Sequence, residues 1–496
     1  MKKLINQIEK NTKEFQKKIS KKNRKSKSQF FTTLSIAKYM SNLSCKYNDK
    51  DNLNILDCGA GTGILAFSLV DKLIEEGFKG TLNIDLYEND EVVIDVLLKN
   101  IDIYKAKYKN LNIKVFQSNF ILENMKLWED KSFKGKYDIV ISNPPYKKLK
   151  KSSDEAMAMK SIVYGQPNIY FLFMAMSIHL LKNNGEMLFI TPRSFTSGTY
   201  FKVFRSYFLD NTCIRNVHIF DSRSDVFDSE EVLQEAIITR TIKNNNKNNE
   251  LVNISISKGA DFEDIKSIKV YSDDLITNCN NRFILLPSSN EEVKILSKLS
   301  KYKNNLINLG FKLRTGKVVD FRAIEYLTKK EEKEAVPLFW PDNFINNKIV
   351  NVENYNNYRY ILNKESSKNI LQENKDYILI KRFSSKEENR RIQAAIYNKS
   401  EFNRFDKIGI ENHINFIEKI NGVMTKEEQY GLFCIFNSTI IDKYYRILNG
   451  NTQVNATEFN SIPLPEGDII INLGKELLNL GDLETEACDL IISKYI

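Results

Sequence analysis

Short apolar runs and amphipathic stretches alternate along the first half of the chain. Most apolar runs of strand length are followed by a stretch whose apolar positions recur at helical spacing. The runs that predict strands are 54–57, 82–87, 113–116, 137–142, 186–191, 217–220, 236–242 and 251–256. Strands that alternate with helices are typical of a doubly wound α/β domain. We therefore predict this fold class for the N-terminal part of the chain.

One low-complexity run interrupts the alternation. Residues 243–250 are nearly all asparagine and lysine, and they separate the predicted strands 236–242 and 251–256. Such a composition favours a loop over a packed element. We therefore expect a loop here, with the two flanking strands joined as a hairpin.

The pattern changes near residues 282–286. A charged helix is predicted over 291–299, and the sequence beyond it has the irregular mixture of elements typical of an α+β domain. The chain is therefore divided into three parts, 1–28, 29–285 and 286–496. Basic and aromatic residues interleave in the last part, as in Lys381-Arg382-Phe383, so this part is the candidate region for recognising a target.

The first 28 residues combine a basic composition with helical periodicity. They hold eleven Lys or Arg and two acidic residues. The apolar positions at helical spacing are Leu4, Ile5, Ile8, Phe15 and Ile19. This pattern predicts a basic amphipathic helix. Its apolar stripe would pack on the neighbouring domain, or its basic face would contact phosphates.

A glycine-rich turn follows the predicted strand 54–57. The segment Asp57–Gly63 reads DCGAGTG, and glycines let the backbone approach a nucleotide-like ligand at the end of a strand. The segment 61–66 also satisfies the dinucleotide fingerprint, so a dehydrogenase stays open at this point. Asp57 favours S-adenosylmethionine, because its carboxylate could meet the donor's ammonium or order the loop. Glu88, at the end of the next strand, could accept hydrogen bonds from ribose hydroxyls.

The segment Asn143-Pro144-Pro145-Tyr146 directly follows the strand 137–142. A planar amino group is a poor nucleophile because its lone pair is delocalised. The Asn143 side-chain oxygen and the Pro144 carbonyl could each accept one N–H, which favours a pyramidal nitrogen whose lone pair faces a methyl donor. The two prolines fix φ and remove N–H donors, and Tyr146 offers a flat face for stacking. Alone, the segment also fits a plain turn, but the upstream glycine motif favours methyl transfer.

In this order, the motifs resemble those of bacterial DNA adenine-N6 methyltransferases of the γ class, the TaqI-like modification enzymes. The segments that carry the resemblance are Gln29–Thr33 (QFFTT), Asp57–Gly63 (DCGAGTG), Leu86–Asp90 (LYEND), Ser118–Phe120 (SNF) and Asn143–Tyr146 (NPPY). The order indicates the subclass, because QFFTT precedes the glycine loop and the large variable region is C-terminal. Segments 313–322 and 451–457 are similar to parts of BsuBI- and PstI-type modification methylases, so the resemblance covers nearly the whole chain.

The resemblance implies a Rossmann-like S-adenosylmethionine-dependent methyltransferase domain over 29–285 and a DNA target-recognition domain over 286–496. The donor pocket would include Thr32, Asp57, Gly59, Ala60, Gly61, Gly63, Glu88, Asn119 and Phe120. The target base would be held at Asn143, Pro144, Pro145 and Tyr146, with Phe227 stacked on the flipped base.

Two residues depart from the family pattern. The family usually carries Thr-Pro where this chain has Thr32-Thr33, and Asp where it has Asn119. Asn119 can still accept or donate at an adenine edge, but without charge.

Length, charge and cysteine usage fit this interpretation. The 496 residues are enough for two or three domains, and the net charge of +10 suits a polyanionic partner. The six cysteines form no Cys-x-x-Cys pair, so neither a zinc site nor a disulfide framework is indicated. No secretory signal is recognisable, and the longest apolar stretch, 170–181, is too short to span a bilayer. We expect a cytoplasmic protein without a membrane partner.

The sequence thus predicts methylation of adenine N6 in double-stranded DNA, in a type II restriction-modification system with a separate cognate endonuclease. Three alternatives stay open. A cytosine-N4 methyltransferase would use the same chemistry, although that class more often begins its loop with Ser. Methyltransferases of release-factor glutamine or RNA guanine are usually much shorter, which would leave 286–496 unexplained. A non-enzymatic DNA-binding module would not need the donor pocket.

Overall fold

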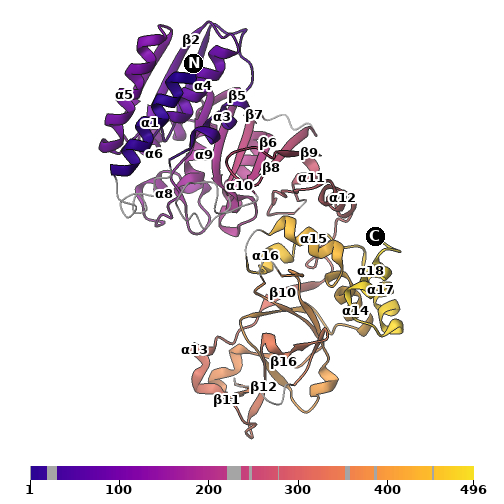
Figure 1. The fold of residues 1–496 in the computed structure, drawn as a ribbon. Coiled ribbons are helices and arrows are strands. Elements are labelled where there is room, and N and C mark those ends of the chain that lie inside the picture. The colour runs from indigo at the N-terminus through magenta and orange to yellow at the C-terminus, as the bar shows by residue number, and fades with distance from the viewer. Residues whose placement is uncertain are drawn as a thin grey trace. The chain divides into compact units, whose positions relative to one another are not determined.

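The computed structural model describes residues 2–18, 31–220, 236–244, 249–277, 279–351, 358–384, 388–449 and 452–496. The chain divides into two compact units, Met1–Ser288 (unit 1) and Ser289–Ile496 (unit 2) (Figure 1). The sequence-based division lay between residues 285 and 286. The N-terminal helix α1 (Lys2–Lys18) belongs to unit 1 and packs against its helices.

Unit 1 is built on a nine-stranded sheet in the order β3-β2-β1-β4-β5-β7-β6-β8-β9. The strands are β1 (Asn52–Asp57), β2 (Thr81–Tyr87), β3 (Leu111–Phe116), β4 (Tyr137–Ser142), β5 (Leu181–Pro192), β6 (Thr212–Phe220), β7 (Ala236–Lys243), β8 (Leu251–Ser257) and β9 (Lys266–Tyr271). The first five strands pair in parallel, and β7 pairs antiparallel with β5 and β6. The predicted doubly wound α/β fold is confirmed.

Helices of unit 1 follow the strands as the alternating pattern predicts. They are α3 (Leu34–Asn42), α4 (Ile64–Glu75), α5 (Glu91–Lys107), α6 (Phe120–Glu123), α7 (Met125–Glu129), α8 (Asp154–Ala158), α9 (Ile169–Leu180), α10 (Lys202–Asn211) and α11 (Ser272–Leu275). The helix α1 packs on α4 and α5, whereas α9 contacts β5, α6 and α10.

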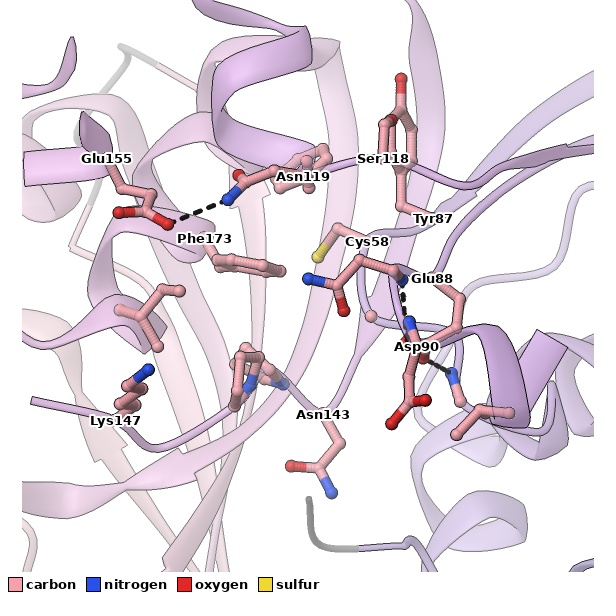
Figure 2. Close-up of a pocket in the computed structure, with 18 of the residues that line it drawn as sticks. Cys58, Tyr87, Glu88, Asp90, Ser118, Asn119, Asn143, Lys147, Glu155 and Phe173 are labelled. Carbon is pink, nitrogen blue, oxygen red and sulfur yellow. Dashed lines mark hydrogen bonds between the residues drawn. The ribbon is translucent and has the colours of Figure 1, made fainter. Parts of the chain in front are cut away.

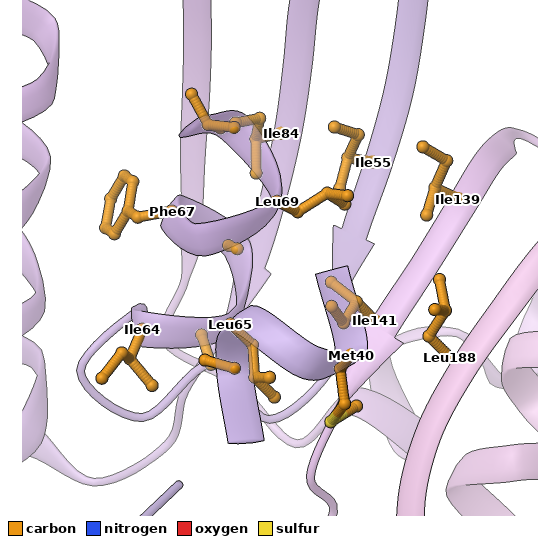
Figure 3. Packing of buried hydrophobic residues seen from close by; sticks show 14 of the residues in the cluster. Met40, Ile55, Ile64, Leu65, Phe67, Leu69, Ile84, Ile139, Ile141 and Leu188 are labelled. Atoms are coloured by element: carbon orange, nitrogen blue, oxygen red, sulfur yellow. The ribbon is translucent and has the colours of Figure 1, made fainter. Parts of the chain in front are cut away.

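The core of unit 1 holds the central strands in place against α4 (Figure 3). Ile139 and Ile141 of β4 are two residues apart, so their side chains point to the same face of the sheet. Leu65 and Leu69 of α4 are four residues apart and share one face of the helix. All four side chains are buried in one cluster. This packing fixes where β1 and β4 end, and so where the following loops begin.

The predicted hairpin between 236–242 and 251–256 is wrong. Both strands form, as β7 and β8, but β6 lies between them in the sheet. β6 pairs antiparallel with β7 and parallel with β8. Local sequence predicted a short connection, whereas the sheet places β6 between the two strands.

Unit 2 contains two further sheets and a group of helices. The six-stranded sheet runs β10 (Phe311–Thr315), β20 (Ile414–Lys419), β17 (Tyr377–Lys381), β18 (Ala394–Tyr397), β14 (Lys348–Ile349) and β13 (Phe344–Ile345). The five-stranded sheet runs β11 (Leu327–Thr328), β15 (Tyr360–Leu362), β12 (Ala335–Phe339), β19 (Lys407–Ile410) and β16 (Leu371–Glu373). The helices are α12 (Asn290–Leu299), α13 (Asp320–Ala323), α14 (Lys426–Phe436), α15 (Thr439–Leu448), α16 (Ala456–Phe459), α17 (Gly467–Leu480) and α18 (Thr485–Ile492). This is the α+β class that the sequence predicted.

Within the described ranges, no helix has the length and apolar character needed to cross a bilayer. The same residues bring together no group of three or more His, Cys, Asp or Glu side chains that could hold a metal ion. All six cysteines are free thiols.

Candidate functional site

A pocket of about 640 Å³ lies where β1, β2 and β4 end (Figure 2). The carboxyl ends of parallel strands are where open α/β sheets bind ligands, and this volume suits a nucleoside-sized molecule. Residues predicted from distant parts of the sequence meet in its lining, namely Gly59, Gly61, Glu88, Asn119, Phe120, Asn143, Pro144 and Pro145. The predicted residue Phe227 lies outside the described part of the chain.

Asp57 connects the glycine loop to the strand that precedes Asn143. Its carboxyl group is fully buried, and Oδ1 accepts hydrogen bonds from the Gly59 N–H (3.2 Å) and the Ser142 hydroxyl (2.9 Å). Oδ2 is also buried and has no hydrogen-bond partner among the described residues. Burial raises the pKa of Asp57 to about 7. Asp57 therefore orders the loop, and one of its oxygens is still available as an acceptor.

Glu88 orders the other side of the glycine loop. Its Oε2 accepts from the Gly61 N–H (3.0 Å), and its Oε1 accepts from the N–H groups of Asn89 and Asp90 (2.9 Å each). Burial raises the pKa of this carboxyl group. Because Oε2 accepts only this one hydrogen bond, from Gly61, among the described residues, its second lone pair can still accept one from a ligand hydroxyl.

Gly63 has a conformation that only glycine adopts readily. Its φ is +87°, and it directly precedes the first turn of α4. A Cβ at this position would lie 2.5 Å from the ring of Phe67. The third glycine of the motif is therefore required by the packing of α4 as well as by the turn.

Asn143 lies against the glycine loop and lines the pocket. A Cβ added to Gly59 would lie 3.6 Å from the Asn143 backbone oxygen, so the two segments are in close contact. The Asn143 Nδ2 donates to Thr32 Oγ1 (3.2 Å), and its Oδ1 accepts from the Tyr146 hydroxyl (2.9 Å). The carboxamide is thus held in one orientation.

Tyr146 turns its hydroxyl inward. The hydroxyl oxygen lies 3.1 Å from the Ile190 carbonyl oxygen as well as near Asn143, and burial raises the pKa of the phenol well above its ordinary value. The half-buried ring packs on the core cluster of unit 1 and stands edge-on to Tyr170, with ring centres 6.3 Å apart. Its role as a stacking surface for a base stays a prediction.

Thr33 stands where the family usually has proline, and it caps α3. Its hydroxyl oxygen accepts a hydrogen bond from the Ile36 N–H (3.4 Å), as a threonine at this position commonly does. The neighbouring Thr32 is nearly buried and contacts Asn143. Thr33 therefore fixes the start of α3, and with it the position of Thr32, which orients Asn143.

Asn119, the second departure from the family pattern, uses both ends of its amide. Its Oδ1 accepts from the N–H groups of Ile121 and Leu122 and caps α6, and its Nδ2 donates to Glu155 Oε1 (2.9 Å) (Figure 2). Glu155 lies in the pocket lining. A carboxylate is therefore present at this edge of the pocket, but it comes from α8 and not from position 119.

Two aromatic rings form the apolar part of the same edge. Phe120 is almost fully buried, and its ring centre lies 5.1 Å from that of Phe173. Both rings line the pocket, with Phe173 near its middle in Figure 2. Sequence reasoning singled out Phe120 but not Phe173 or Glu155, because neither of these carries a local signal. Ser142 was also missed, although its place directly before Asn143 could have suggested it.

The N-terminal helix packs against the back of the glycine loop. Thr12 Oγ1 lies 2.8 Å from Thr62 Oγ1 in a buried contact, and Asn11 Nδ2 donates to Asn100 Oδ1 (2.7 Å). Asn100 in turn donates to the Thr62 carbonyl (2.9 Å). The prediction that the apolar stripe of this helix packs on its neighbour is confirmed for the described residues.

Comparisons with known proteins agree with this geometry. The family model described as Eco57I restriction-modification methylase matches residues 32–227. The chain is 34% identical to the type II methyltransferase M.BsuBI of Bacillus subtilis, over 94% of either chain. It is 31% identical to the type II methyltransferase M.PstI of Providencia stuartii, over 94% of this chain and 92% of the other. The solved structure of the type IIL restriction-modification enzyme MmeI in complex with DNA shares the fold, with a TM-score of 0.50, 13% identity, and coverage of 98% of this chain and 73% of that chain.

Proposed function

The chain belongs to the type II methyltransferases of restriction-modification systems, and from this premise we propose that it methylates adenine N6 in double-stranded DNA with S-adenosylmethionine as donor. The proposal includes extrusion of the target adenine from the duplex, because the amino group cannot reach a pocket while it is stacked. A separate endonuclease of the same specificity would complete the system.

The observation that carries this proposal is the position of Asn143 beside the glycine loop. Its carboxamide is held in one orientation by Thr32 and Tyr146, and an amide oxygen is an acceptor for an N–H. The Pro144 carbonyl is a second acceptor on the same loop. Two fixed acceptors would each accept a hydrogen bond from one N–H of an exocyclic amine. These bonds would weaken the conjugation of the nitrogen lone pair at the moment of attack.

The pocket residues fit the proposed donor. S-adenosylmethionine supplies an electrophilic methyl group on a sulfonium sulfur. Glu88 is an acceptor at the end of β2, where ribose hydroxyls would bind, and Phe120 and Phe173 offer apolar faces for an adenine. The spare oxygen of Asp57 is a buried acceptor close beneath the loop, so Asp57 can act electrostatically on an ammonium group while it holds Gly59.

Adenine N6 is favoured over cytosine N4 by the first residue of the loop, since Asn143 stands where the cytosine-N4 class more often has Ser. Methylation of a glutamine or of an RNA base would leave unit 2 without a role, whereas a DNA enzyme needs a second surface to read sequence. A DNA-binding module without catalysis would not need the pocket of about 640 Å³.

Substitution of Asn143 tests the proposal. Asn143→Ala removes one of the two acceptors, so we expect the rate of methyl transfer to fall by at least about a hundredfold while duplex binding persists. The measurement is transfer of labelled methyl groups to plasmid DNA, followed by mass spectrometry of the released nucleosides. N6-methyladenine should be the only product of the wild-type chain.

The matched control is Asn112→Ala, which removes the same amide from an exposed position on β3. This variant should methylate as the wild type does. Retained turnover in Asn143→Ala would refute the role of the loop, and N4-methylcytosine as the product would replace adenine by cytosine in the proposal.

A further inference from the structure

Two segments that lie far apart in the sequence meet in unit 2. They are 313–322 and the described part of 451–457. Asn415, which is fully buried, joins them, because its Oδ1 accepts from the Thr315 hydroxyl (2.9 Å) and its Nδ2 donates to the Val454 carbonyl (2.9 Å). The surface at this junction is therefore built by the fold from three places in the chain.

A buried carboxylate beside this junction holds an exposed histidine. Glu411 is fully buried, and it accepts hydrogen bonds from the backbone N–H of His413 (2.8 Å) and from its ring Nδ1 (2.6 Å). A carboxylate only accepts, so Nδ1 carries the hydrogen and the tautomer is fixed. The histidine side chain is 51% exposed, and its Nε2 has no hydrogen-bond partner among the described residues.

Glycine at position 316 permits this arrangement. A Cβ there would collide with the carbonyl oxygen of Glu411. The adjoining Val318 forms a parallel bridge with Glu411, so the exposed Lys317 lies beside the same strand end. The backbone of Lys317 therefore runs beside Glu411, and its ammonium donates to the Asn369 carbonyl (3.3 Å).

An aromatic ring and a guanidinium group flank the histidine. The ring centre of Phe383 lies 5.0 Å from that of His413, and the Arg382 guanidinium lies 5.5 Å from the Phe383 centre. Arg382 Nη1 also donates to the Asn412 carbonyl (3.0 Å), which limits its motion. Phe383 is 40% exposed, so part of its ring faces solvent beside His413.

The backbone of Phe383 pairs with Gln453, which completes the surface. We define the His413 patch as Lys317, Arg382, Phe383, His413, Thr452 and Gln453. Thr452 and Gln453 are exposed. The patch carries two cations, one aromatic face and several hydrogen-bonding groups, and none of its six side chains is a carboxylate.

We propose that the His413 patch is where unit 2 contacts the target duplex, and that His413 reads a base edge there. This inference rests on the proposed function. With Nδ1–H engaged by Glu411, Nε2 of the neutral ring is an acceptor, which suits the exocyclic amine of adenine or cytosine in the major groove. Lys317 and Arg382 are placed for phosphates. Glu411 is a positioning residue, because it acts through His413.

The alternative is a histidine that only neutralises a buried carboxylate. Such a role would not require half of the side chain to face solvent, nor an exposed phenylalanine and an arginine beside it. Apart from the buried Glu411, the six side chains of the patch carry no negative charge that would repel a phosphate backbone. These features together favour duplex DNA as the partner.

The test begins with the sites that the wild-type chain methylates, mapped by single-molecule sequencing of DNA from the expressing host. A duplex with the mapped site and a scrambled duplex of the same composition are then titrated with the full chain in the presence of S-adenosylhomocysteine. We expect His413→Ala to lose at least about tenfold in affinity for the mapped duplex and less than about twofold for the scrambled one. Glu411→Gln should lose part of the same preference.

Two further variants separate base reading from phosphate binding. His413→Gln keeps an acceptor and should retain more of the preference than His413→Ala. Lys317→Ala should weaken binding to both duplexes about equally. It should also lower the slope of log affinity against log salt concentration by about one. The matched control is Lys475→Ala, an exposed lysine on α17, which should leave both affinities unchanged. S-adenosylhomocysteine affinity and unfolding temperature, measured for His413→Ala, should equal those of the wild type.

The outcomes distinguish this inference from the proposed function. If the wild type methylates DNA but His413→Ala binds both duplexes as before, the patch does not contact the target and only this inference fails. If His413→Ala weakens binding to both duplexes equally, His413 contacts phosphates, and the inference that it reads a base is overturned. If the wild type methylates no DNA, both the inference and the proposed function fail.

Discussion

At the scale of single residues, Asp57 is unusual because it is buried with only one oxygen hydrogen-bonded. Burial raises its pKa from 3.8 to about 7, so the folded chain holds the proton more tightly than the unfolded chain does. Below about pH 4 both states are protonated, so ionisation adds no penalty to the burial of this group. As the pH rises from there to about 7, the folded state loses stability, because its carboxyl group resists ionisation.

This loss of stability with rising pH gives a prediction for Asp57→Asn. The variant carries no charge at any pH, so it avoids the loss that the wild type suffers. Between about pH 5.5 and about pH 8.5, we expect the stability of the variant relative to the wild type to rise by about 2 kcal/mol. Thermal unfolding of both chains at the two pH values measures it. A difference that stays constant across this range would show that Asp57 does not titrate as its burial requires.

Asn119 and Glu155 form a pair whose interaction can be measured. In the wild type, Asn119 Nδ2 donates to Glu155 Oε1 over 2.9 Å. Asn119→Asp would replace this donor by a second carboxylate at the same distance. We expect this variant to bind S-adenosylhomocysteine about tenfold more weakly, because the repulsion distorts the pocket edge. The double variant with Glu155→Gln should recover to within about twofold, since a donor again faces a carboxylate. Calorimetry on the four chains measures the coupling, and independent, additive effects would exclude it.

At the scale of elements, α1 is the clearest case of a helix whose packing supports the site. Its apolar residues Ile5 and Ile8 are buried in the core of unit 1, and Thr12 contacts Thr62 in the glycine loop. A single amphipathic helix of this length would be marginal in water, so its stability comes from this tertiary packing. The basic face stays exposed to solvent.

The packing predicts that Ile8→Ala destabilises unit 1. Ile8 is fully buried, and removal of three carbons from such a site typically costs about 2–5 kcal/mol. Asn6→Ala, on the exposed face of the same helix, is the matched control and should change stability by less than about 0.5 kcal/mol. Denaturant unfolding followed by circular dichroism compares the variants. Equal stability of Ile8→Ala and Asn6→Ala would contradict the packing of α1 on the core.

At the scale of the whole molecule, charge and architecture agree. The chain carries a net charge of +10 and folds as an α/β unit with the pocket and an α+β unit with the His413 patch. Two units suit an enzyme that has to hold a duplex and also admit one base to a pocket. The net charge raises association with any polyanion and by itself gives no sequence preference.

Salt dependence tests the electrostatic contribution. We expect the dissociation constant for a scrambled duplex to rise by at least about tenfold between 50 and 200 mM salt, because bound Lys and Arg release counterions from phosphates. Binding of S-adenosylhomocysteine should change little over the same range. Fluorescence anisotropy and calorimetry provide the two measurements. A dissociation constant that is flat with salt would mean that the basic residues do not contact phosphates.

Periodicity and motif spacing were sufficient to predict both fold classes and the strand ends that carry Asp57, Glu88 and Asn143. These are local properties, since the alternation of apolar residues and the chemistry of Gly and Pro act over a few positions. Family resemblance added Phe120 and Asn119. No local pattern could supply Glu155 or Phe173, because each meets the pocket only after α8 and α9 have packed.

Other features were decided only by the tertiary structure. The sheet inserts β6 between β7 and β8, since strand order depends on the pairing of distant segments and not on the loop between neighbours in sequence. Glu411 lies only two residues from His413 in the sequence, but only the fold buries that carboxylate and leaves the ring exposed. The sequence by itself determined the elements and the chemistry of their ends. Burial, strand order and contacts between distant side chains came from packing, which no short stretch of the chain encodes.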